Sequence, residues 1–593
     1  MASESQGGRN NRRSLYLLFG LAVAASIGAG IWMMSRPAST LKPPDGSVAK
    51  EGAEASEAGT PWFQDMTKAS GVDFVYRNGE EADRFTILES LGGGVAMIDY
   101  DGDGLLDLFF PGGGHFEGNA TRGHPCRLFK NLGGWKFRDV TKEVGLSDID
   151  FYTHGCAVAD YDCDGWPDLV VTGYKRLALF RNEPGPQGRR FVDATAKAGL
   201  DDRLWSSSAA FGDFTGSGFP DLYVCHYVDW SFDNDPFCGK KEPADERDVC
   251  PPQKFKPLPH VLYRNQKDGT FRVADQPLRS DGSGLGVVVA DFQGNGKPGI
   301  YVANDGTNNH FYVNAGKQLE ERGLSSGVAV DDQLMMNGSM GVDTADYDGS
   351  GRASIFVTNF QGEVHALYQN LGTDRFSYQS YAAGLGALGR SHVGFGTHFV
   401  DLDNDGWEDI VIANGHVLRR PRGSSIKQKP HLLRNVEFQK RRRFQDVSAR
   451  GGPAFGTPVV GRGLAVGDLD NDGWPDVVMS NTNSPCVLLR NIAGETSKAG
   501  WIGVTLVGKN NRDVTGSTVW LEQDSKRLTR FSKGGGSYLS ASDRRILFGL
   551  GESKTPGTLT VRWSWGEQQQ WKGLGANQYW TLRESEAEAR PMK

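Results

Sequence analysis

Nine residues decide the fold of this chain: Asp401-Leu402-Asp403-Asn404-Asp405-Gly406-Trp407-Glu408-Asp409. Aspartates stand at positions 1, 3, 5 and 9 of this loop, and glycine stands at position 6. Four acids this close repel one another unless a cation lies between them. Ca2+ suits such a loop because it accepts about six to eight oxygen ligands in irregular geometry. The apolar run 409–413 follows where an EF-hand would have a helix, so we expect a calcium loop within a β-hairpin.

The same pattern recurs along most of the chain. Acidic loops begin at seven positions: Asp99, Asp160, Asp213, Asp291, Asp346, Asp401 and Asp468. Each loop lies between two short apolar runs, and most units add a third run that ends in Asn, as in Leu128-Phe129-Lys130-Asn131. A short fourth run then follows. Four short strands per unit are typical of a propeller blade, so the sequence predicts an all-β fold with a seven-bladed β-propeller over residues 61–495.

The run Trp62-Phe63-Gln64-Asp65-Met66 has the pattern of a fourth strand but precedes the first loop. We expect it to complete the last blade, which otherwise ends at Asn491, and so to close the ring. Closure of this kind protects the edges of the sheets. An open solenoid with capped ends is the alternative.

Four loops carry the full set of acids and are predicted to hold about four structural Ca2+ ions. The expected ligands are the carboxylates at positions 1, 3, 5 and 9 and the carbonyl of position 7. They are Asp99, Asp101, Asp103, Leu105 and Asp107; Asp160, Asp162, Asp164, Trp166 and Asp168; Asp401, Asp403, Asp405, Trp407 and Asp409; and Asp468, Asp470, Asp472, Trp474 and Asp476. Acidic turns that cap hairpins without an ion are the alternative. Loops 213–221, 291–299 and 346–354 keep fewer acids, so we expect them to bind weakly or to hold no ion.

These repeats resemble the FG-GAP/VCBS repeats of the integrin α-subunit type of propeller, over about residues 62–492. The resemblance rests on the full D-x-D-x-D-G-x-x-D motif, which is present four times. Residues 496–586 follow a different, alternating pattern that predicts a small antiparallel β-domain. Within them, Gly534-Gly535-Gly536-Ser537-Tyr538 and Phe548-Gly549-Leu550-Gly551 resemble the ASPIC/UnbV module, which accompanies FG-GAP repeats in proteins of the cartilage acidic protein type. That resemblance implies a fold and says little about activity.

The N-terminus contains about twenty apolar residues without a charge, at 15–34, enough to cross a bilayer. Three arginines precede them, which predicts a cytoplasmic segment 1–14 and an extracytoplasmic remainder. We expect one transmembrane helix that anchors the protein in the membrane, followed by a flexible linker over 35–60. A cleaved signal peptide, which would make the protein secreted, is the alternative.

Seven cysteines are few for 593 residues. A disulfide between Cys238 and Cys250 would close a polar loop outside the core, which fits an oxidising compartment such as the periplasm or the cell surface. Cys156 and Cys163 flank one acidic loop and either pair or are simply buried.

The opposite end of each hairpin gathers histidine, asparagine and aromatic residues. A ligand face is predicted there from His154, His226, Asn304, Asp305, His392, Asn414 and His416. Loops on a rigid scaffold commonly carry binding function. Ordinary polar turn chemistry is the alternative, since asparagine is also a turn residue.

The composition narrows the function further. The net charge of −7 comes without a basic stripe, which argues against a nucleic-acid partner. No G-x-S-x-G elbow or P-loop is present. We therefore expect an extracytoplasmic calcium-binding propeller that binds a protein or glycan ligand, or serves adhesion. The alternatives are a propeller enzyme acting on glycans or another extracellular substrate through the face opposite the loops, and a purely structural envelope protein.

Overall fold

The computed structural model describes residues 59–592, apart from 187, 241–245, 277, 317, 524–525 and 554. The segments predicted as cytoplasmic N-terminus, transmembrane anchor and most of the linker therefore lie outside the described residues. Within the described ranges, no helix is long and apolar enough to cross a membrane. The α-helices found there are short, namely α2 (Thr67–Ser70), α3 (Gly323–Ser326) and α4 (Pro453–Gly456).

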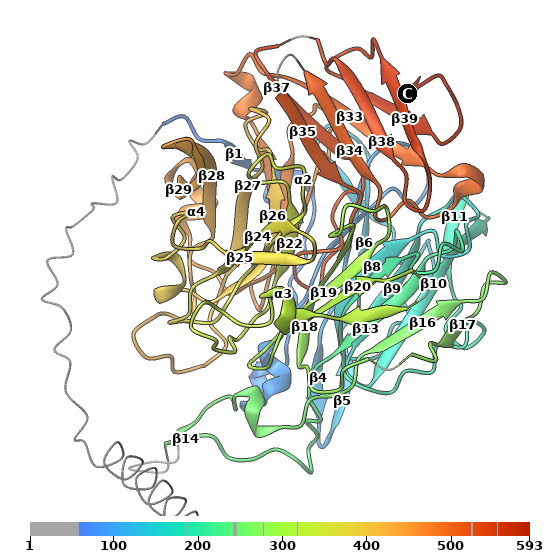
Figure 1. Ribbon diagram of the computed structural model, residues 1–593. Helices are drawn as coiled ribbons and strands as arrows, with labels where there is room; N and C mark the ends of the chain where they lie inside the picture. The colour runs from blue at the N-terminus through green and yellow to red at the C-terminus, as the bar shows by residue number, and fades with distance from the viewer. Residues whose placement is uncertain are drawn as a thin grey trace, which may run out of the picture. The chain divides into compact units, whose positions relative to one another are not determined.

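Seven sheets, each with four antiparallel strands from the repeats, form seven blades in chain order (Figure 1). Blade one contains β2 (Ala96–Ile98), β3 (Asp107–Phe110), β6 (Arg127–Asn131) and β7 (Phe137–Asp139). Blade two contains β8 (Thr153–Ala159), β9 (Asp168–Gly173), β10 (Arg176–Gly185) and β11 (Gly188–Asp193). Blade three contains β12 (Ser206–Gly212), β13 (Asp221–His226), β16 (Val261–Asn265) and β17 (Phe271–Val273). Blade four contains β18 (Gly284–Ala290), β19 (Gly299–Asn304), β20 (His310–Asn314) and β21 (Leu319–Glu321). Blade five contains β22 (Val342–Ala345), β23 (Ser354–Val357), β24 (Ala366–Gly372) and β25 (Arg375–Tyr378). Blade six contains β26 (Gly394–Val400), β27 (Asp409–Asn414), β28 (His431–Phe438) and β29 (Arg441–Asp446). Blade seven contains β30 (Gly461–Gly467), β31 (Asp476–Asn481), β32 (Val487–Asn491) and β1 (Phe63–Asp65).

The blades close into a ring. The first strands of consecutive blades are neighbours, and β30 of blade seven contacts both β26 and β2. The predicted closure is confirmed, because β1 pairs with β32 and places Phe63 opposite Asn491. The core consists of apolar clusters between adjacent blades and one cluster around the axis, where Trp205, Tyr227 and Phe395 are buried.

Seven asparagines tie each blade to the one before it. Each stands at or near the end of a third strand and donates its side-chain N–H to the main-chain oxygen of the second residue of the acidic loop in the preceding blade. The bonds run from Asn131 to Leu469, Asn182 to Tyr100, Asn265 to Tyr161, Asn314 to Phe214, Asn370 to Phe292, Asn435 to Tyr347 and Asn491 to Leu402, over 2.8–3.1 Å. All seven asparagines are buried, so the bonds fix the register between blades.

The C-terminal domain is built from two further four-stranded sheets. One contains β37 (Ile546–Gly551), β33 (Gly500–Val507), β40 (Tyr579–Arg583) and β41 (Arg590–Pro591). The other contains β35 (Lys526–Phe531), β34 (Thr518–Gln523), β38 (Thr558–Arg562) and β39 (Gln568–Lys572). The prediction of an antiparallel domain is wrong in one respect, because β33 and β40 are parallel. Alternating apolar residues define strands but do not specify their partners, which is why the sequence missed this pairing.

The segment 532–545 of this domain enters the axis of the propeller. Its short strand β36 (Gly534–Gly535) adds to β18 as a fifth strand of blade four. Tyr538 is fully buried and donates its hydroxyl to Leu91 O over 3.0 Å, while Leu539 O accepts from Cys156 N over 3.0 Å. Glycine is required at this approach, since a Cβ on Gly534 would lie 2.0 Å from Phe211 O.

The asparagine ring yields a prediction about stability. Asn370 Nδ2 donates to Phe292 O over 2.9 Å and to Ala353 O over 3.0 Å, and both bonds are buried. Asn370→Ala leaves two buried carbonyls without this donor, so we expect the free energy of unfolding to fall by about 2–4 kcal/mol. Urea denaturation of the full-length chain measures this. Asn119→Ala, at an exposed asparagine, is the control, and equal midpoints for both variants would contradict the role of the ring.

Candidate functional site

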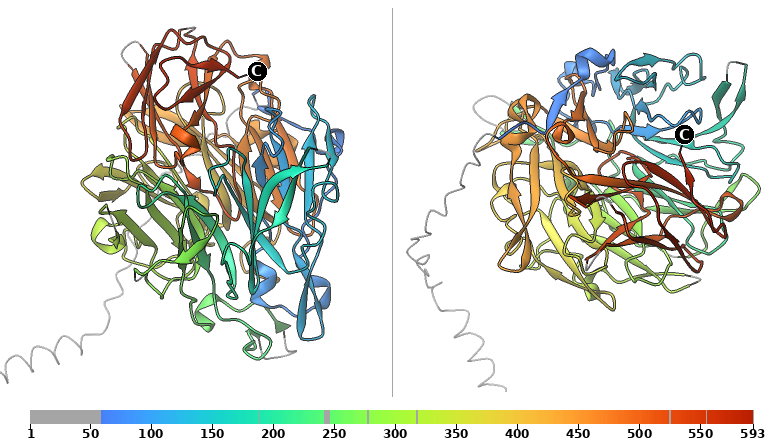
Figure 2. Two further views of the ribbon diagram at one scale, coloured as in Figure 1. Left: turned by 90° about the vertical axis from the view of Figure 1, so that its right-hand side faces the viewer. Right: turned by 90° about the horizontal axis from the view of Figure 1, so that it is seen from above.

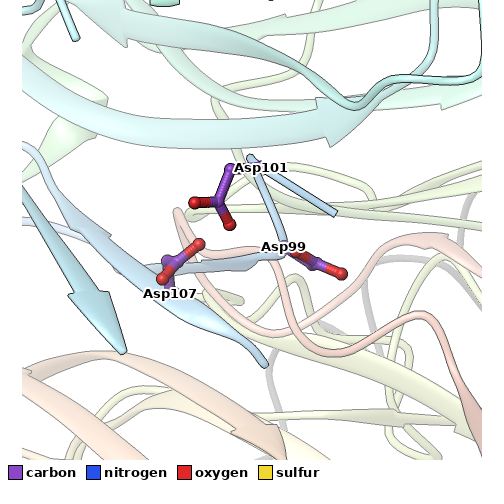
Figure 3. A group of neighbouring side chains, drawn as sticks. All are labelled: Asp99, Asp101 and Asp107. Atoms are coloured by element: carbon purple, nitrogen blue, oxygen red, sulfur yellow. The ribbon is translucent and has the colours of Figure 1, made fainter. Parts of the chain in front are cut away.

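Carboxylates gather in all four complete loops. In each loop, three carboxylate oxygens from different residues lie within 4.8 Å of one another. The groups are Asp99, Asp101 and Asp107; Asp160, Asp162 and Asp168; Asp401, Asp403 and Asp405; and Asp468, Asp470 and Asp476. Figure 3 shows the carboxylates of Asp101 and Asp107 turned toward one another in blade one. The structure therefore brings together carboxylates that the sequence spacing had identified, in groups that are able to hold a metal ion.

Backbone donors hold each loop in shape. In blade six, Asp401 accepts N–H groups from Asp405 and Gly406, over 3.0 and 2.8 Å. Asp409 accepts from Leu402 N over 3.2 Å and from Asn435 N over 2.8 Å, which ties the loop to the third strand. Burial and then the charge of Asp403 raise the pKa of Asp409 well above its ordinary value. The aspartates at position 9 are at most 1% exposed in all four complete loops, so little solvent screens a charge there.

The aspartate at position 3 is the clearest sign of an ion. One oxygen of each faces a basic residue of the third strand: Asp101 with Lys130, Asp162 with Arg181, Asp403 with Arg434 and Asp470 with Arg490. The other oxygen, Oδ1, is buried in all four and has no hydrogen-bond partner among the described residues. A buried acceptor without a partner is costly. A cation would satisfy it, and an all-oxygen donor set fits a hard ion such as Ca2+.

At positions 5 and 7 the loops show one further contact. The main-chain N–H of Leu105, Trp166, Trp407 and Trp474 donates to the aspartate at position 5 of its own loop, over 2.9–3.0 Å. Ligation by the carbonyls of these four residues stays a prediction. The basic residue of the third strand was visible in the sequence, but its role was not, because only the fold brings it next to the loop.

Two of the incomplete loops use an arginine as countercharge. In blade three, Arg264 Nη1 lies 2.7 Å from Asp221 Oδ2. In blade four, Arg562 of the C-terminal domain lies 2.7 Å from Asp291 Oδ2 and donates to Gly294 O. A guanidinium thus pairs with one carboxylate in each of these loops. Sequence reasoning missed Arg562, since it comes from another domain.

Most of the predicted ligand face lies inside the blades. His154, His226, Asn304 and Asn414 are at most 1% exposed. His226 Nε2 lies 2.9 Å from Asp202 Oδ2, and Asn414 Nδ2 donates to Lys429 O over 2.8 Å. Asn304 donates to Asn308 O over 2.7 Å, His154 Nδ1 lies 3.2 Å from Gly92 O, and His392 Nδ1 lies 3.1 Å from Ser391 Oγ. The four buried side chains bond to groups of their own or neighbouring blades, because a polar group at a buried strand end needs a partner. His392 is partly buried and contacts the adjacent Ser391.

Asp305 and His416 do line a cavity of about 920 Å3. Asp305 Oδ2 accepts the hydroxyl of Tyr227 over 2.6 Å, and His416 Nε2 lies 2.9 Å from Gln361 Oε1. A second carboxylate, Glu363, also lines the cavity and accepts Gly338 N over 2.8 Å. Burial raises the pKa of Asp305 to about 6 and that of Glu363 to about 7. No lysine or arginine among the described residues forms an ion pair with either carboxylate.

The cavity lies away from the acidic loops. Its wall includes Cys238 and Cys250, which form the predicted disulfide. Figure 1 places the neighbouring strand β14 (Gly239–Lys240) at the end of the propeller far from the C-terminal sheets, and Figure 2 shows the same separation from the side. Cys156 is buried and Cys163 is partly buried, and neither is in a disulfide.

The fold and the loops define a class, a propeller of acidic-loop repeats with an inserted C-terminal β-domain. Family models agree: "ASPIC and UnbV" matches residues 507–589, "FG-GAP-like repeat" matches 99–171 and 160–224, and "FG-GAP repeat" matches 460–496. The chain therefore contains FG-GAP repeats and an ASPIC/UnbV domain.

The chain is also homologous to cartilage acidic protein 1. It is 25% identical to the Xenopus tropicalis protein over 497 residues, which are 73% of this chain and 74% of that protein. It is 26% identical to the human protein over 374 residues, 58% of this chain, and the match spans about half of the human protein's length, 50%. Among solved structures, an Agrocybe aegerita lectin is 17% identical with a TM-score of 0.36, covering 66% of this chain and 87% of the lectin. The rhamnogalacturonan lyase YesW is 13% identical with a TM-score of 0.34, covering 68% and 72%.

The buried histidines yield a prediction about pH. Burial lowers the pKa of His154 from 6.5 to about 4. Below pH 6.5 the unfolded chain takes up a proton at this residue that the folded chain does not, so the free energy of unfolding falls as the pH decreases toward 4. His154→Gln should remove up to about 2 kcal/mol of the loss between pH 7 and pH 5, at about 1.4 kcal/mol per pKa unit. Urea denaturation at several pH values measures this. His115→Gln, in the hairpin β4–β5 (Gly114–Glu117 and Ala120–Gly123), is the control, and parallel profiles for His154→Gln and the native protein would contradict the assignment.

Proposed function

We propose that this protein is an extracytoplasmic calcium-binding propeller that serves as a binding module for a protein or glycan ligand, as in adhesion. One observation carries the calcium assignment: the same buried, partnerless oxygen recurs at Asp101, Asp162, Asp403 and Asp470. A catalytic group would be expected once, whereas a structural ion is expected in every blade that keeps the acids. The disulfide Cys238–Cys250 supports an oxidising compartment. Anchoring in the membrane through residues 15–34 is part of the proposal.

The proposed ions brace the joints between blades. Leu402, the second residue of its loop, donates its N–H to Asp409 and accepts the side chain of Asn491 from blade seven. An ion held by Asp401, Asp403 and Asp405 would fix the loop and therefore the position of the Leu402 carbonyl. Calcium would then stabilise the contact between two blades as well as one hairpin.

The ligand site is proposed at the cavity that contains Asp305 and His416. The other end of the propeller is covered by the chain's own C-terminal domain, whose Arg530, Arg545 and Arg562 contact the acidic loops. The cavity combines carboxylates with apolar side chains such as Phe360 and Met340. Mixed lining of this kind is typical of ligand sites.

Chelation tests the calcium assignment. A site kept at about a hundred times its Kd contributes about 2.7 kcal/mol to stability, so we expect EGTA to lower the melting temperature of the full-length chain. Asp403→Asn should bind one Ca2+ fewer in equilibrium dialysis and should lose less stability on chelation. Asp148→Asn, at an exposed aspartate, should behave like the native protein. A melting temperature that EGTA does not change would contradict the calcium assignment.

An enzyme acting on glycans is the second candidate function, and it is favoured by the raised pKa values of Asp305 and Glu363 in one cavity. Carboxylates with raised pKa serve as general acids. A glycan panel incubated with the full-length chain separates the two functions by scoring retention and cleavage.

We expect retention without cleavage, because Asp305 and Glu363 are both held by hydrogen bonds within the fold, from the Tyr227 hydroxyl and from Gly338 N. Asp305→Asn should weaken retention about tenfold or more, the loss expected for a hydrogen bond to a charged group. Asp332→Asn, at an exposed carboxylate that is not part of the cavity wall, should leave it unchanged. Cleavage that Glu363→Gln abolishes would instead establish the enzyme.

A further inference from the structure

The acidic loop of blade five differs in shape from the other six. In those six, the main-chain N–H at position 5 donates to the aspartate at position 1. In blade five, Ser350 N donates instead to Asp348 Oδ1 over 3.1 Å. Asp346 Oδ1, at position 1, is consequently buried and has no hydrogen-bond partner within the described part of the chain. The loop also has Ser354 at position 9 in place of a carboxylate.

Three more oxygens of the same kind come from around this loop. Ser350 Oγ of the loop, Glu408 Oε2 of blade six and Thr529 Oγ1 of β35 are all buried without a hydrogen-bond partner in the described ranges. Asp346 is 4% exposed, Glu408 is 7% exposed and Thr529 is 1% exposed. Four partnerless acceptors thus come from two blades and the C-terminal domain.

Contacts place these groups together. A Cβ on Gly351 would lie 3.8 Å from Thr529 Oγ1, and Gly351 N donates to Asp346 Oδ2 over 2.9 Å. Burial and then the charge of Asp348 raise the pKa of Asp346 to about 7, with the nearby charge of Glu408 acting in the same direction and the Thr529 hydroxyl acting against it. Both groups are therefore close enough to act on Asp346.

Of the two carboxylates in this cluster, Glu408 lies beside a protein cation and Asp346 does not. Among the described residues, no lysine or arginine forms an ion pair with Asp346, in contrast to Asp221 and Asp291 of the other incomplete loops. Arg530 Nη1 lies 3.5 Å from Glu408 Oε2, but its guanidinium donates to the main-chain oxygens of Gly406 and Thr529 over 3.1 Å. The carboxylate of Asp346 needs another positive charge.

We propose that Asp346, Ser350, Glu408 and Thr529 form a divalent-cation site that joins blades five and six to the C-terminal domain. Its donors are oxygens only, two carboxylates and two hydroxyls, which selects a hard ion such as Ca2+. Blade five alone is short of acids, and the neighbouring blade and the second domain supply the missing donors. The site goes beyond the four complete loops: Glu408 stands at position 8 of loop 401–409 but is not one of that loop's predicted calcium ligands. It makes the docking of the C-terminal domain dependent on the ion.

The test counts ions in the full-length chain by equilibrium dialysis against Ca2+ and elemental analysis. We expect five bound ions for the native protein and four for Thr529→Val, which keeps the shape of the side chain but removes the hydroxyl. Thr529→Ser keeps the hydroxyl and should restore five. Thr560→Val is the matched control. Thr529 on β35 and Thr560 on β38 pair with Trp520 from the two sides of β34, and both hydroxyls are buried without a hydrogen-bond partner in the described residues. Thr560 lies two strand spacings away, about 10 Å, so its loss should leave five ions.

Other outcomes have defined meanings. Equal counts for the native protein and Thr529→Val would overturn the proposal and would mean that water satisfies these oxygens. If Thr529→Val fails to fold, as judged by circular dichroism, Asp346→Asn replaces it with the same expected loss of one ion. If the four complete loops hold no ion, Asp403→Asn leaves the count unchanged while Thr529→Val still lowers it by one. Failure of the calcium loops and failure of the interdomain site are thereby distinguished.

Discussion

The ring depends on one hydrogen bond that recurs at every joint, from the asparagine at the end of a third strand to a carbonyl of the preceding acidic loop. Its donor and acceptor are buried, so either one left alone would carry a desolvation cost of about 1–3 kcal/mol. The bond also couples two features that the sequence treats separately. The accepting residue lies inside the loop. In the five loops that have an aspartate at position 9, this aspartate accepts the N–H groups of that residue and of the asparagine in its own blade, as in Leu402, Asp409 and Asn435. The same hydrogen bonds therefore fix both the shape of the loop and the register between neighbouring blades.

Compensation of buried carboxylates explains how the seven blades differ. Four keep the complete acid set, and their partnerless position-3 oxygens suit a cation. Blades three and four have lost acids, and one remaining carboxylate in each, Asp221 and Asp291, pairs with Arg264 and Arg562. Blade five has lost acids without gaining an arginine, and its uncompensated Asp346 meets Glu408 and Thr529 at the domain boundary. The blades thus differ in what lies beside their buried carboxylates, and an unpaired buried charge is the state that folding disfavours.

Much of this architecture was predictable, because a repeated motif sets strands and loops at once. The seven loops, the closing strand at Trp62–Met66 and the four complete acid sets all follow from spacing. The burial of His154 and Asn414 did not follow, because the same residue types serve exposed loops and buried strand ends. The insertion of Gly534–Gly536 into the axis was not predicted either. A run of glycines indicates a close approach of the backbone to another group, but it does not identify that group. The parallel pairing of β33 with β40 was missed for a related reason: strand patterns carry no partner information.

The inserted segment decides which surface is free for a ligand. Tyr538 and Leu539 belong to the buried cluster around the axis, and the C-terminal sheets lie at the acidic-loop end. Arginines of the C-terminal domain contact acidic loops there, as Arg562 does at Asp291. At the other end, Asp305 and Glu363 share a cavity with Lys240, Arg420 and Arg422, but neither carboxylate forms an ion pair with a lysine or arginine among the described residues. Uncompensated carboxylates in a cavity gain most from a ligand that brings hydrogen-bond donors or positive charge. The propeller thus separates the end that holds the structure together from the end that is available for recognition.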